Sequence, residues 1–582
     1  MKNLMEKKLQ YIFNIVCIIL LLFSPSNINS KAYPQLNPIE TDSQDAQDFD
    51  AQDFDIAEDD DNDITTYIPN WAKVQKRAKD TVVQVFSQVS EFNWEQPYKT
   101  PDQSSACGTG FFIYNQGHLL TNFHVIDEAV SIKIQIPTLG KERFTTKVIG
   151  VCPERDLALL KLTDISRTQI INKLGKISHL NLGNSDIIRR TNQILALGYP
   201  LSQEKLKSTQ GIVSGRENID NESYIQITAA INKGNSGGPS LNSKGEVIGI
   251  NTCGVSKAQS VGYIIPINDI KNVIKDLHKV RLLRKPSFGC IINKGTKELV
   301  KFLNNPEPGG LYVSHVFKNT LLEKAGIQAG DMIYSINSRV FDLYGETQVS
   351  WAEDKVPATA LVNRLKLGEK IGIDFYRNGE RKITSFNFDL QPELPIRTIY
   401  PEYEKVDYEI IGGLVIMELS LNHIDIFQNK NPMLIKYTKR EHQYKSRLII
   451  THILPNSQAQ QARVISKAAI IKKINGIPVN TLADLRAAVI TNKEFLSIAT
   501  ENKEFMVLSM KKIIKQEDAL TKRYFYKKSE IFKAFEPEPE ILETPIIPET
   551  QVTPEPPVPP TNQTPIMQIM QEAQEQEVQE PN

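Results

Sequence analysis

The segment Gly234-Asn-Ser-Gly-Gly-Pro constrains this chain more than any other feature, because it surrounds one serine with residues that permit a sharp turn. Glycine adopts backbone conformations that other residues avoid, so the loop can bring backbone N–H groups together beside the serine hydroxyl. The amides of Gly234 and Ser236, converging in this way, form an oxyanion hole. The segment therefore predicts that Ser236 is a nucleophile with its oxyanion hole next to it.

A serine nucleophile needs a histidine as general base and a carboxylate that orients the histidine. Of the eight histidines, His124 has the most suitable setting, because the apolar stretch that starts at Gly117 reads as a β-hairpin ending at this residue. Asp156 stands in a polar turn before an apolar alternation typical of a half-buried strand. The order His124, Asp156, Ser236 is that of chymotrypsin-like double β-barrels, whereas other serine hydrolase folds use other orders. Two alternatives remain: His124 as a core histidine, and Asp156 as a turn cap.

Three segments together resemble the catalytic blocks of the HtrA/Deg (DegP-like) serine endoproteases: Thr121-Asn-Phe-His-Val, Arg155-Asp-Leu-Ala-Leu-Leu and Gly234-Asn-Ser-Gly-Gly-Pro. The resemblance extends from about residue 71 to 279. It implies a catalytic triad of His124, Asp156 and Ser236. Thr228 and Lys233 depart from the family pattern, which often has aspartate and proline at these places.

Downstream, Gly309-Gly-Leu-Tyr-Val and the helix and Gly-Asp turn that follow Leu321 resemble a PDZ domain. A weaker second copy begins at Leu448, and there Ser466-Lys-Ala-Ala replaces the Gly-Asp turn. PDZ domains bind an extended peptide at a sheet edge and hold its C-terminal carboxylate with backbone amides. The first module is therefore expected to bind C-terminal peptides.

The expected substrate contacts fall into two groups of residues. The resemblance places Ile231, Asn232 and Asn251 near the pocket for the side chain before the scissile bond. The carboxylate-binding loop of the first PDZ module is expected at Phe288, Gly289, Cys290 and Ile291, where a plain strand start is the alternative.

The expected fold is mainly β: a chymotrypsin-like double β-barrel protease domain followed by two PDZ-like α+β domains. The expected parts are a signal peptide (1–32), an acidic disordered linker (33–66), a trypsin-like serine protease domain (67–283), a first PDZ domain (286–392), an extended PDZ-like domain (393–515) and a Pro/Glu/Gln-rich disordered tail (516–582).

The formal net charge of zero conceals a strong asymmetry along the chain. Residues 40–63 contain twelve acidic and no basic residues, and residues 535–582 contain ten acidic and no basic residues. The middle of the chain is therefore basic, but its charges are dispersed and lack a nucleic-acid-binding motif. No nucleic acid partner is expected.

The N-terminus predicts export. Lysines at positions 2, 7 and 8 precede an apolar run over residues 11–23, and small residues follow near Ser30. This run is short for a membrane span, which needs about 20 residues, although an uncleaved anchor is the alternative. The expected location is the periplasm or cell envelope, with secretion as a further destination.

These observations lead to one main hypothesis and two rivals. The main hypothesis is an exported, ATP-independent serine endopeptidase that degrades misfolded or damaged envelope proteins, needs no cofactor or metal, and forms a homo-oligomer such as a trimer. The first rival is a PDZ-based holdase chaperone or adaptor with an inactive protease domain. The second is a structural protein whose basic body binds an anionic surface.

Overall fold

The computed structural model describes residues 70–254 and 261–535. The expected signal peptide and acidic linker lie outside the described residues, as does the tail from residue 536 onward. Among the described residues, no helix combines the length and the apolar composition that a membrane crossing requires.

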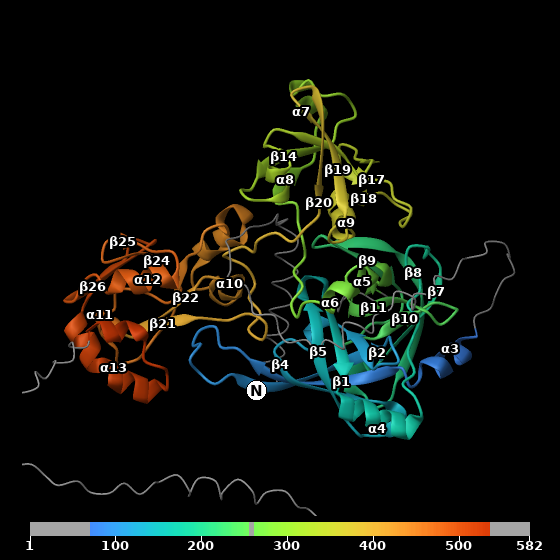
Figure 1. Cartoon of the computed structure of the whole chain (residues 1–582), viewed down its shortest axis with the longest axis horizontal. Coiled ribbons are helices and arrows are strands. Elements are labelled where there is room, and N and C mark those ends of the chain that lie inside the picture. The colour runs from blue at the N-terminus through green and yellow to red at the C-terminus, as the bar shows by residue number, and fades with distance from the viewer. Residues whose placement is uncertain (1–69, 255–260, 536–582) are drawn as a thin grey trace, which may run out of the picture. The chain divides into compact units, whose positions relative to one another are not determined.

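The first six strands close into a barrel, which Figure 1 draws in blue and blue-green. They are β1 (Val82–Glu91), β2 (Asp102–Phe112), β3 (His118–Thr121), β4 (Ala129–Gln135), β5 (Phe144–Cys152) and β6 (Leu157–Leu162). Their order around the barrel is β1-β2-β3-β6-β5-β4, and β1 pairs with both β2 and β4. The next six strands form a second closed barrel in the order β10-β11-β12-β9-β8-β7. They are β7 (Gln193–Gly198), β8 (Lys207–Ile219), β9 (Glu222–Ile227), β10 (Pro239–Leu241), β11 (Val247–Gly254) and β12 (Gly262–Pro266).

Strand β6 shows how the two barrels share a core. Ala158 and Leu160 point into the first barrel, whereas Leu157 and Leu159 pack in a cluster that also contains Leu197 of the second barrel. The sequence predicted a half-buried strand here, but both faces of β6 are buried, because the second face is covered by the neighbouring barrel. The mainly β double barrel is confirmed.

The α-helices of the described residues beside the barrels are α3 (Trp71–Ala78), α4 (Asp164–Leu174), α5 (Ile267–Lys271) and α6 (Ile274–Leu277).

The first PDZ-like module is a sheet with the order β13-β14-β15-β19-β20. Its strands are β13 (Cys290–Asn293), β14 (Leu311–Val316), β15 (Met332–Ile336), β16 (Arg339–Val340), β17 (Glu346–Thr347), β18 (Val356–Pro357), β19 (Lys370–Arg377) and β20 (Glu380–Asn387), and its helices are α7 (Lys297–Phe302), α8 (Leu321–Lys324) and α9 (Ala358–Asn363). Asp331 of the Gly-Asp turn is fully buried and forms an ion pair with Arg377, 2.6 Å between Oδ1 and Nε.

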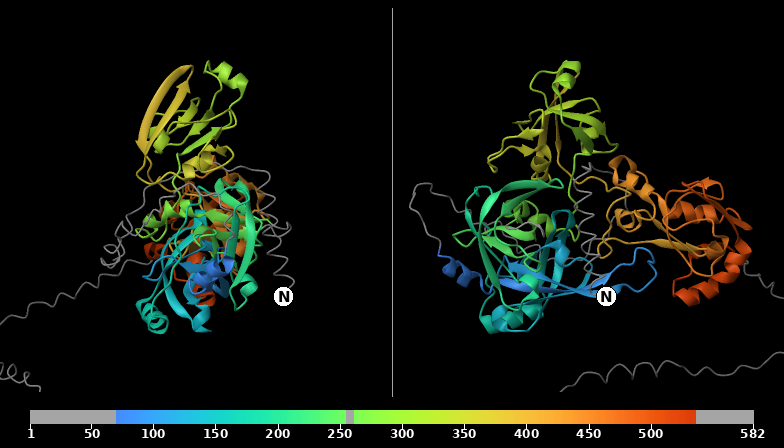
Figure 2. Two further views of the ribbon diagram at one scale, coloured as in Figure 1. Left: turned by 90° about the vertical axis from the view of Figure 1, so that its right-hand side faces the viewer. Right: turned by 180° about the vertical axis from the view of Figure 1, so that it is seen from behind.

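The second module, orange and red in Figure 2, has a sheet with the order β21-β22-β23-β24-β26-β27. Its strands are β21 (Tyr408–Ile411), β22 (Leu414–Glu418), β23 (Leu448–Ile453), β24 (Ile470–Ile474), β25 (Ile477–Pro478), β26 (Phe495–Thr500) and β27 (Phe505–Ser509), and its α-helices are α10 (Leu421–Phe427), α11 (Gln458–Ala462), α12 (Leu482–Val489) and α13 (Met510–Tyr524). Ala468 and Ala469, at the place of the missing Gly-Asp turn, are buried. Helix α13 continues past residue 515, where the module was expected to end, and Ile531 and Phe532 also pack in its core.

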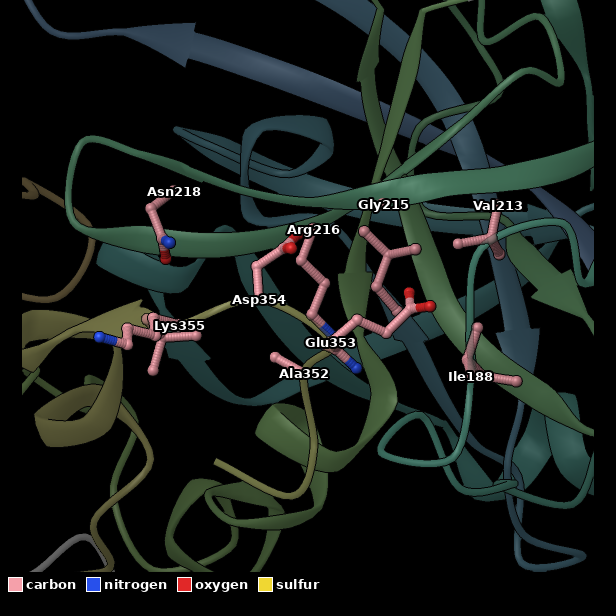
Figure 3. Close-up of a pocket in the computed structure, with 11 residues that line it drawn as sticks. Ile188, Val213, Gly215, Arg216, Asn218, Ala352, Glu353, Asp354 and Lys355 are labelled. Carbon is pink, nitrogen blue, oxygen red and sulfur yellow. The ribbon is translucent and has the colours of Figure 1, made fainter. Parts of the chain in front are cut away.

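The first PDZ module contacts the second barrel through the segment before and after α9. Arg364 pairs with Asp186 at 2.7 Å and with Asp269 at 3.3 Å, and its guanidinium lies 4.4 Å from the ring of Trp351. A small pocket lies at this contact, and Arg216 of β8 and Glu353 are among the residues that line it (Figure 3). None of the expected site residues lines this pocket.

The connection between β1 and β2 reaches the second module. Trp94 is 8% exposed and packs in one cluster with Phe427 and Ile449, and its ring meets His423 edge-on with centroids 5.1 Å apart. Glu95 pairs with Lys430 at 2.9 Å.

We expect Trp94→Ala to weaken this packing, since truncating a buried aromatic side chain typically costs about 3–5 kcal/mol. Amide hydrogen exchange of β22 and β23, measured by mass spectrometry, should accelerate in the variant. Phe302→Ala is the control, because Phe302 is 82% exposed and its truncation should leave exchange unchanged. Equal exchange in Trp94→Ala and the parent chain would contradict the packing role of Trp94.

Candidate active site

Asp156 lies between a turn and strand β6, and its position is set by its backbone. The short 3-10 helix Pro153–Arg155 precedes it, and Asp156 itself has left-handed dihedral angles, φ 50° and ψ 45°. Such a conformation is unfavourable for a residue other than glycine and persists where the surroundings hold it. Here Asn122, the residue directly after β3, holds it, because its Nδ2 donates to the Asp156 carbonyl at 2.9 Å.

His124 follows β3 and faces this carboxylate. Its Nδ1 lies 2.8 Å from Asp156 Oδ2 and 3.0 Å from Oδ1, and its backbone N–H donates to Oδ1 at 3.0 Å. With Nδ1 bound to the carboxylate, Nε2 is left to accept a proton. The structure therefore brings together the two residues that the sequence predicted as base and orienting acid.

The second barrel contributes a further hydrogen-bond donor to the same carboxylate. Thr252 of β11 donates from Oγ1 to Asp156 Oδ2 at 2.8 Å. Thr252 is not among the residues predicted from the sequence, whereas its neighbour Asn251, which was predicted, is fully buried. The Asn251 amide donates to Leu197 O at 3.0 Å and accepts from Ser240 Oγ at 2.7 Å, so its side chain is a structural link inside the barrel rather than a substrate contact.

The loop that carries Ser236 is anchored to β2 of the first barrel. Thr109 N–H donates to Ser236 O at 2.9 Å, and Thr109 Oγ1 donates to Gly234 O at 2.6 Å. Gly237 has φ +84°, and a Cβ at this position would lie 2.0 Å from Thr109 O. Only glycine permits this approach, which is why the motif needs it here.

The Ser236 hydroxyl donates to Thr252 O at 2.8 Å. Among the hydrogen bonds of the described residues, none joins Ser236 to His124. Thr252 thus contacts both Ser236, through its carbonyl, and Asp156, through its hydroxyl. The serine hydroxyl must turn from this carbonyl toward His124 Nε2 before the histidine can accept its proton.

The backbone N–H groups of Gly234 and Ser236 donate to no acceptor in the described part of the chain. The preceding carbonyl, Lys233 O, accepts from Leu201 N–H at 2.6 Å. Because the C=O and N–H of a trans peptide point in opposite directions, this bond turns the Gly234 N–H away from Leu201. Both amides are therefore available for an anionic oxygen.

The electrostatics of the site favour a charged histidine. Burial lowers the pKa of His124, but the Asp156 carboxylate outweighs burial, through its charge and its hydrogen bond, and raises the pKa above the ordinary value of 6.5. Burial also raises the pKa of Asp127 to about 6, against the opposing attraction of His124.

The other expected contact residues differ in their surroundings. Ile231 is 8% exposed in the core of the second barrel, whereas Asn232 is exposed and its carbonyl accepts from Asn235 N–H at 2.9 Å. In the first PDZ module, Phe288 and Cys290 pack into the core.

At the same loop, Gly289 has φ +78°, and a Cβ there would lie 2.3 Å from Thr320 Cγ2. Ile291 is half-buried on β13. This loop can therefore offer its backbone rather than its side chains to a ligand.

We expect the imidazole of His124 to titrate above 6.5 in a selectively labelled protein followed by NMR. Asp156→Asn should lower this pKa, because the variant loses the negative charge and the charge-assisted hydrogen bond that stabilise the imidazolium. Thr252→Val is the control that keeps the carboxylate, and it should leave the pKa of His124 raised. A His124 pKa that does not respond to Asp156→Asn would contradict the electrostatic role of Asp156.

Comparison with known proteins gives two matches to domain families. A trypsin-like peptidase domain matches residues 108–250, and a PDZ domain matches residues 400–529, in the module that lacks the Gly-Asp turn.

Curated relatives include a probable periplasmic serine endoprotease DegP-like of Hahella chejuensis, 30% identical over 54% of this chain and 65% of the relative. The periplasmic serine endoprotease DegP of Salmonella typhimurium is 31% identical over 54% of this chain and 65% of its own length. A solved structure, the HtrA-type protease AlgW with decapeptide, is 27% identical over 55% of this chain and 99% of that chain, with a TM-score of 0.43. The chain thus spans about 65% of the length of these curated relatives. The chain contains a trypsin-like peptidase domain and a PDZ domain, and it is homologous to the DegP/HtrA serine endoproteases.

Proposed function

We propose that the chain is a serine endopeptidase whose catalytic triad is Ser236, His124 and Asp156. The observation that carries this proposal is the Asp156 carboxylate, which accepts from His124 Nδ1 and from Thr252 of the second barrel. A carboxylate held in this way fixes the tautomer of the imidazole and stabilises the imidazolium.

The proposed reaction uses groups of this chain at every step. Ser236 Oγ attacks the peptide carbonyl while His124 Nε2 accepts its proton, and the amides of Gly234 and Ser236 stabilise the anionic oxygen. His124 then protonates the leaving amine, which yields an acyl-enzyme, and activates water for its hydrolysis. Thr252 acts as a positioning residue, because it holds Asp156.

The proposed substrates are misfolded or damaged proteins of the cell envelope. The names of the relatives, periplasmic serine endoproteases, support an endopeptidase activity and a periplasmic location. Export through the N-terminal apolar run, which lies outside the described residues, belongs to the same proposal. Peptide segments would bind at the first PDZ module, through the loop at residues 288–291, and the protein would work as a homo-oligomer.

One observation favours a second function, that of a holdase with a resting protease domain. The Ser236 hydroxyl is bound to Thr252 O, and this bond has to break before catalysis. PDZ modules on a chain in this state would bind exposed segments without cleaving them.

Ser236→Ala separates the two functions. We expect the purified parent protein to react with a fluorophosphonate probe and to cleave casein, and we expect both activities to fall to background in the variant, because the nucleophile is absent. Ser385→Ala is the matched control, since Ser385 is an exposed serine on β20, and it should keep full activity.

A parent protein that neither labels nor cleaves, with peptide ligands added, would overturn the protease proposal. The holdase would then be tested by its suppression of casein aggregation. Cleavage that persists in Ser236→Ala would exclude Ser236 as the nucleophile.

A further inference from the structure

Arg440 is a buried cation without a counter-ion in the part of the chain that the structure describes. It begins the 3-10 helix Arg440–His442 of the second module and is 2% exposed. Its Nη2 makes one long contact, 3.5 Å, with Ser287 Oγ, while Nε and Nη1 have no acceptor among the described residues. Burial lowers the pKa of Arg440 to about 8. A guanidinium has five N–H donors, and burying it without an anion is costly, so a compensating partner is expected.

The aromatic residues around Arg440 compensate for its burial only in part. Its Cζ lies 5.2 Å from the centre of the Phe317 ring, a cation–π contact. Tyr444, also of the second module, stacks on the same ring with centroids 4.1 Å apart. The Tyr444 hydroxyl is likewise buried without an acceptor in the described chain. Two residues of the second module therefore place unpaired donors beside Phe317.

These donors adjoin the expected peptide-binding loop of the first PDZ module. Ser287, the contact of Arg440, directly precedes Phe288, and Phe317 N–H donates to Gly289 O at 3.0 Å. The backbone N–H groups of Phe288 and Gly289 donate to no acceptor within the described residues. Free amides and a guanidinium without an anion are the donor set that a carboxylate requires.

We propose that Arg440 of the second module completes the carboxylate site of the first PDZ module, and that the site binds the free C-terminal carboxylate of an extended peptide. The inference rests on the proposed role of the 288–291 loop as a peptide receptor and adds a charged residue of the second module to that site. The ligand's last carboxylate supplies the anion that Arg440 lacks. Because Arg440 is covered, the segment 440–444 has to shift from Phe317 as the peptide enters.

The test measures the binding of three fluorescein-labelled decapeptides to full-length Ser236→Ala protein by fluorescence anisotropy. One peptide ends in valine with a free carboxylate, the second is its C-terminal amide, and the third is an amide with glutamate as last residue. We expect the free acid to bind at least about 10-fold more tightly than either amide, as is typical of a hydrogen bond to a charged group. If the third peptide bound with the same affinity as the first, any carboxylate would suffice, and the specificity for a free C-terminus would be overturned.

Arg440→Gln tests the residue itself. It should weaken binding of the free acid about 10-fold or more and change binding of the valine amide less than about 2-fold. Arg440→Lys should retain part of the preference for the acid. Arg463→Gln removes an exposed arginine of the same module and should change neither affinity.

Two further measurements distinguish a carboxylate ligand of Arg440 from a purely structural role of this side chain. Removal of a buried unpaired charge should leave the melting temperature of Arg440→Gln equal to or above that of the parent. A lower melting temperature with an unchanged preference for the acid, or no preference in the parent, would overturn the proposal. Fluorophosphonate labelling of variants that retain Ser236 measures the reactivity of the nucleophile separately. A variant that loses the preference for the free acid but is still labelled has a defect in the binding site alone.

Discussion

The Asp156 carboxylate is the point at which the two barrels act together. It accepts a backbone and a side-chain hydrogen bond from His124 of the first barrel and a hydroxyl bond from Thr252 of the second. The loop that carries Ser236 also joins the two barrels, because Thr109 of the first barrel donates hydrogen bonds to the carbonyls of Gly234 and Ser236. The site is therefore assembled only when both barrels are packed on their shared core.

The residue before this carboxylate connects the site with the first PDZ module. Arg155 is 8% exposed, and its Nη2 donates to Asn363 O, at the end of α9, at 2.7 Å. Two consecutive residues thus face in different directions, Asp156 toward the histidine and Arg155 toward the PDZ helix.

The second module is bound to the rest of the chain by contacts of different strength. Trp94 lies in an apolar cluster of that module, where burial stabilises the contact. Arg440 lies at another contact, beside Ser287 and Phe317, without a counter-ion among the described residues. Apolar burial favours a permanent contact. An unpaired guanidinium, in contrast, can bind an anionic group of a ligand.

The sequence by itself indicated the double barrel and a pairing of His124 with Asp156 through the order of the three catalytic motifs, and it indicated the PDZ-like modules through their resemblance to that family. Tertiary structure decided the rest. Thr252 lies 96 residues from Asp156, so only folding reveals their hydrogen bond, and the burial of Asn251 follows from the packing of a neighbouring strand. The partner of the Ser236 hydroxyl and the burial of Arg440 likewise depend on contacts between distant segments, which no local pattern encodes.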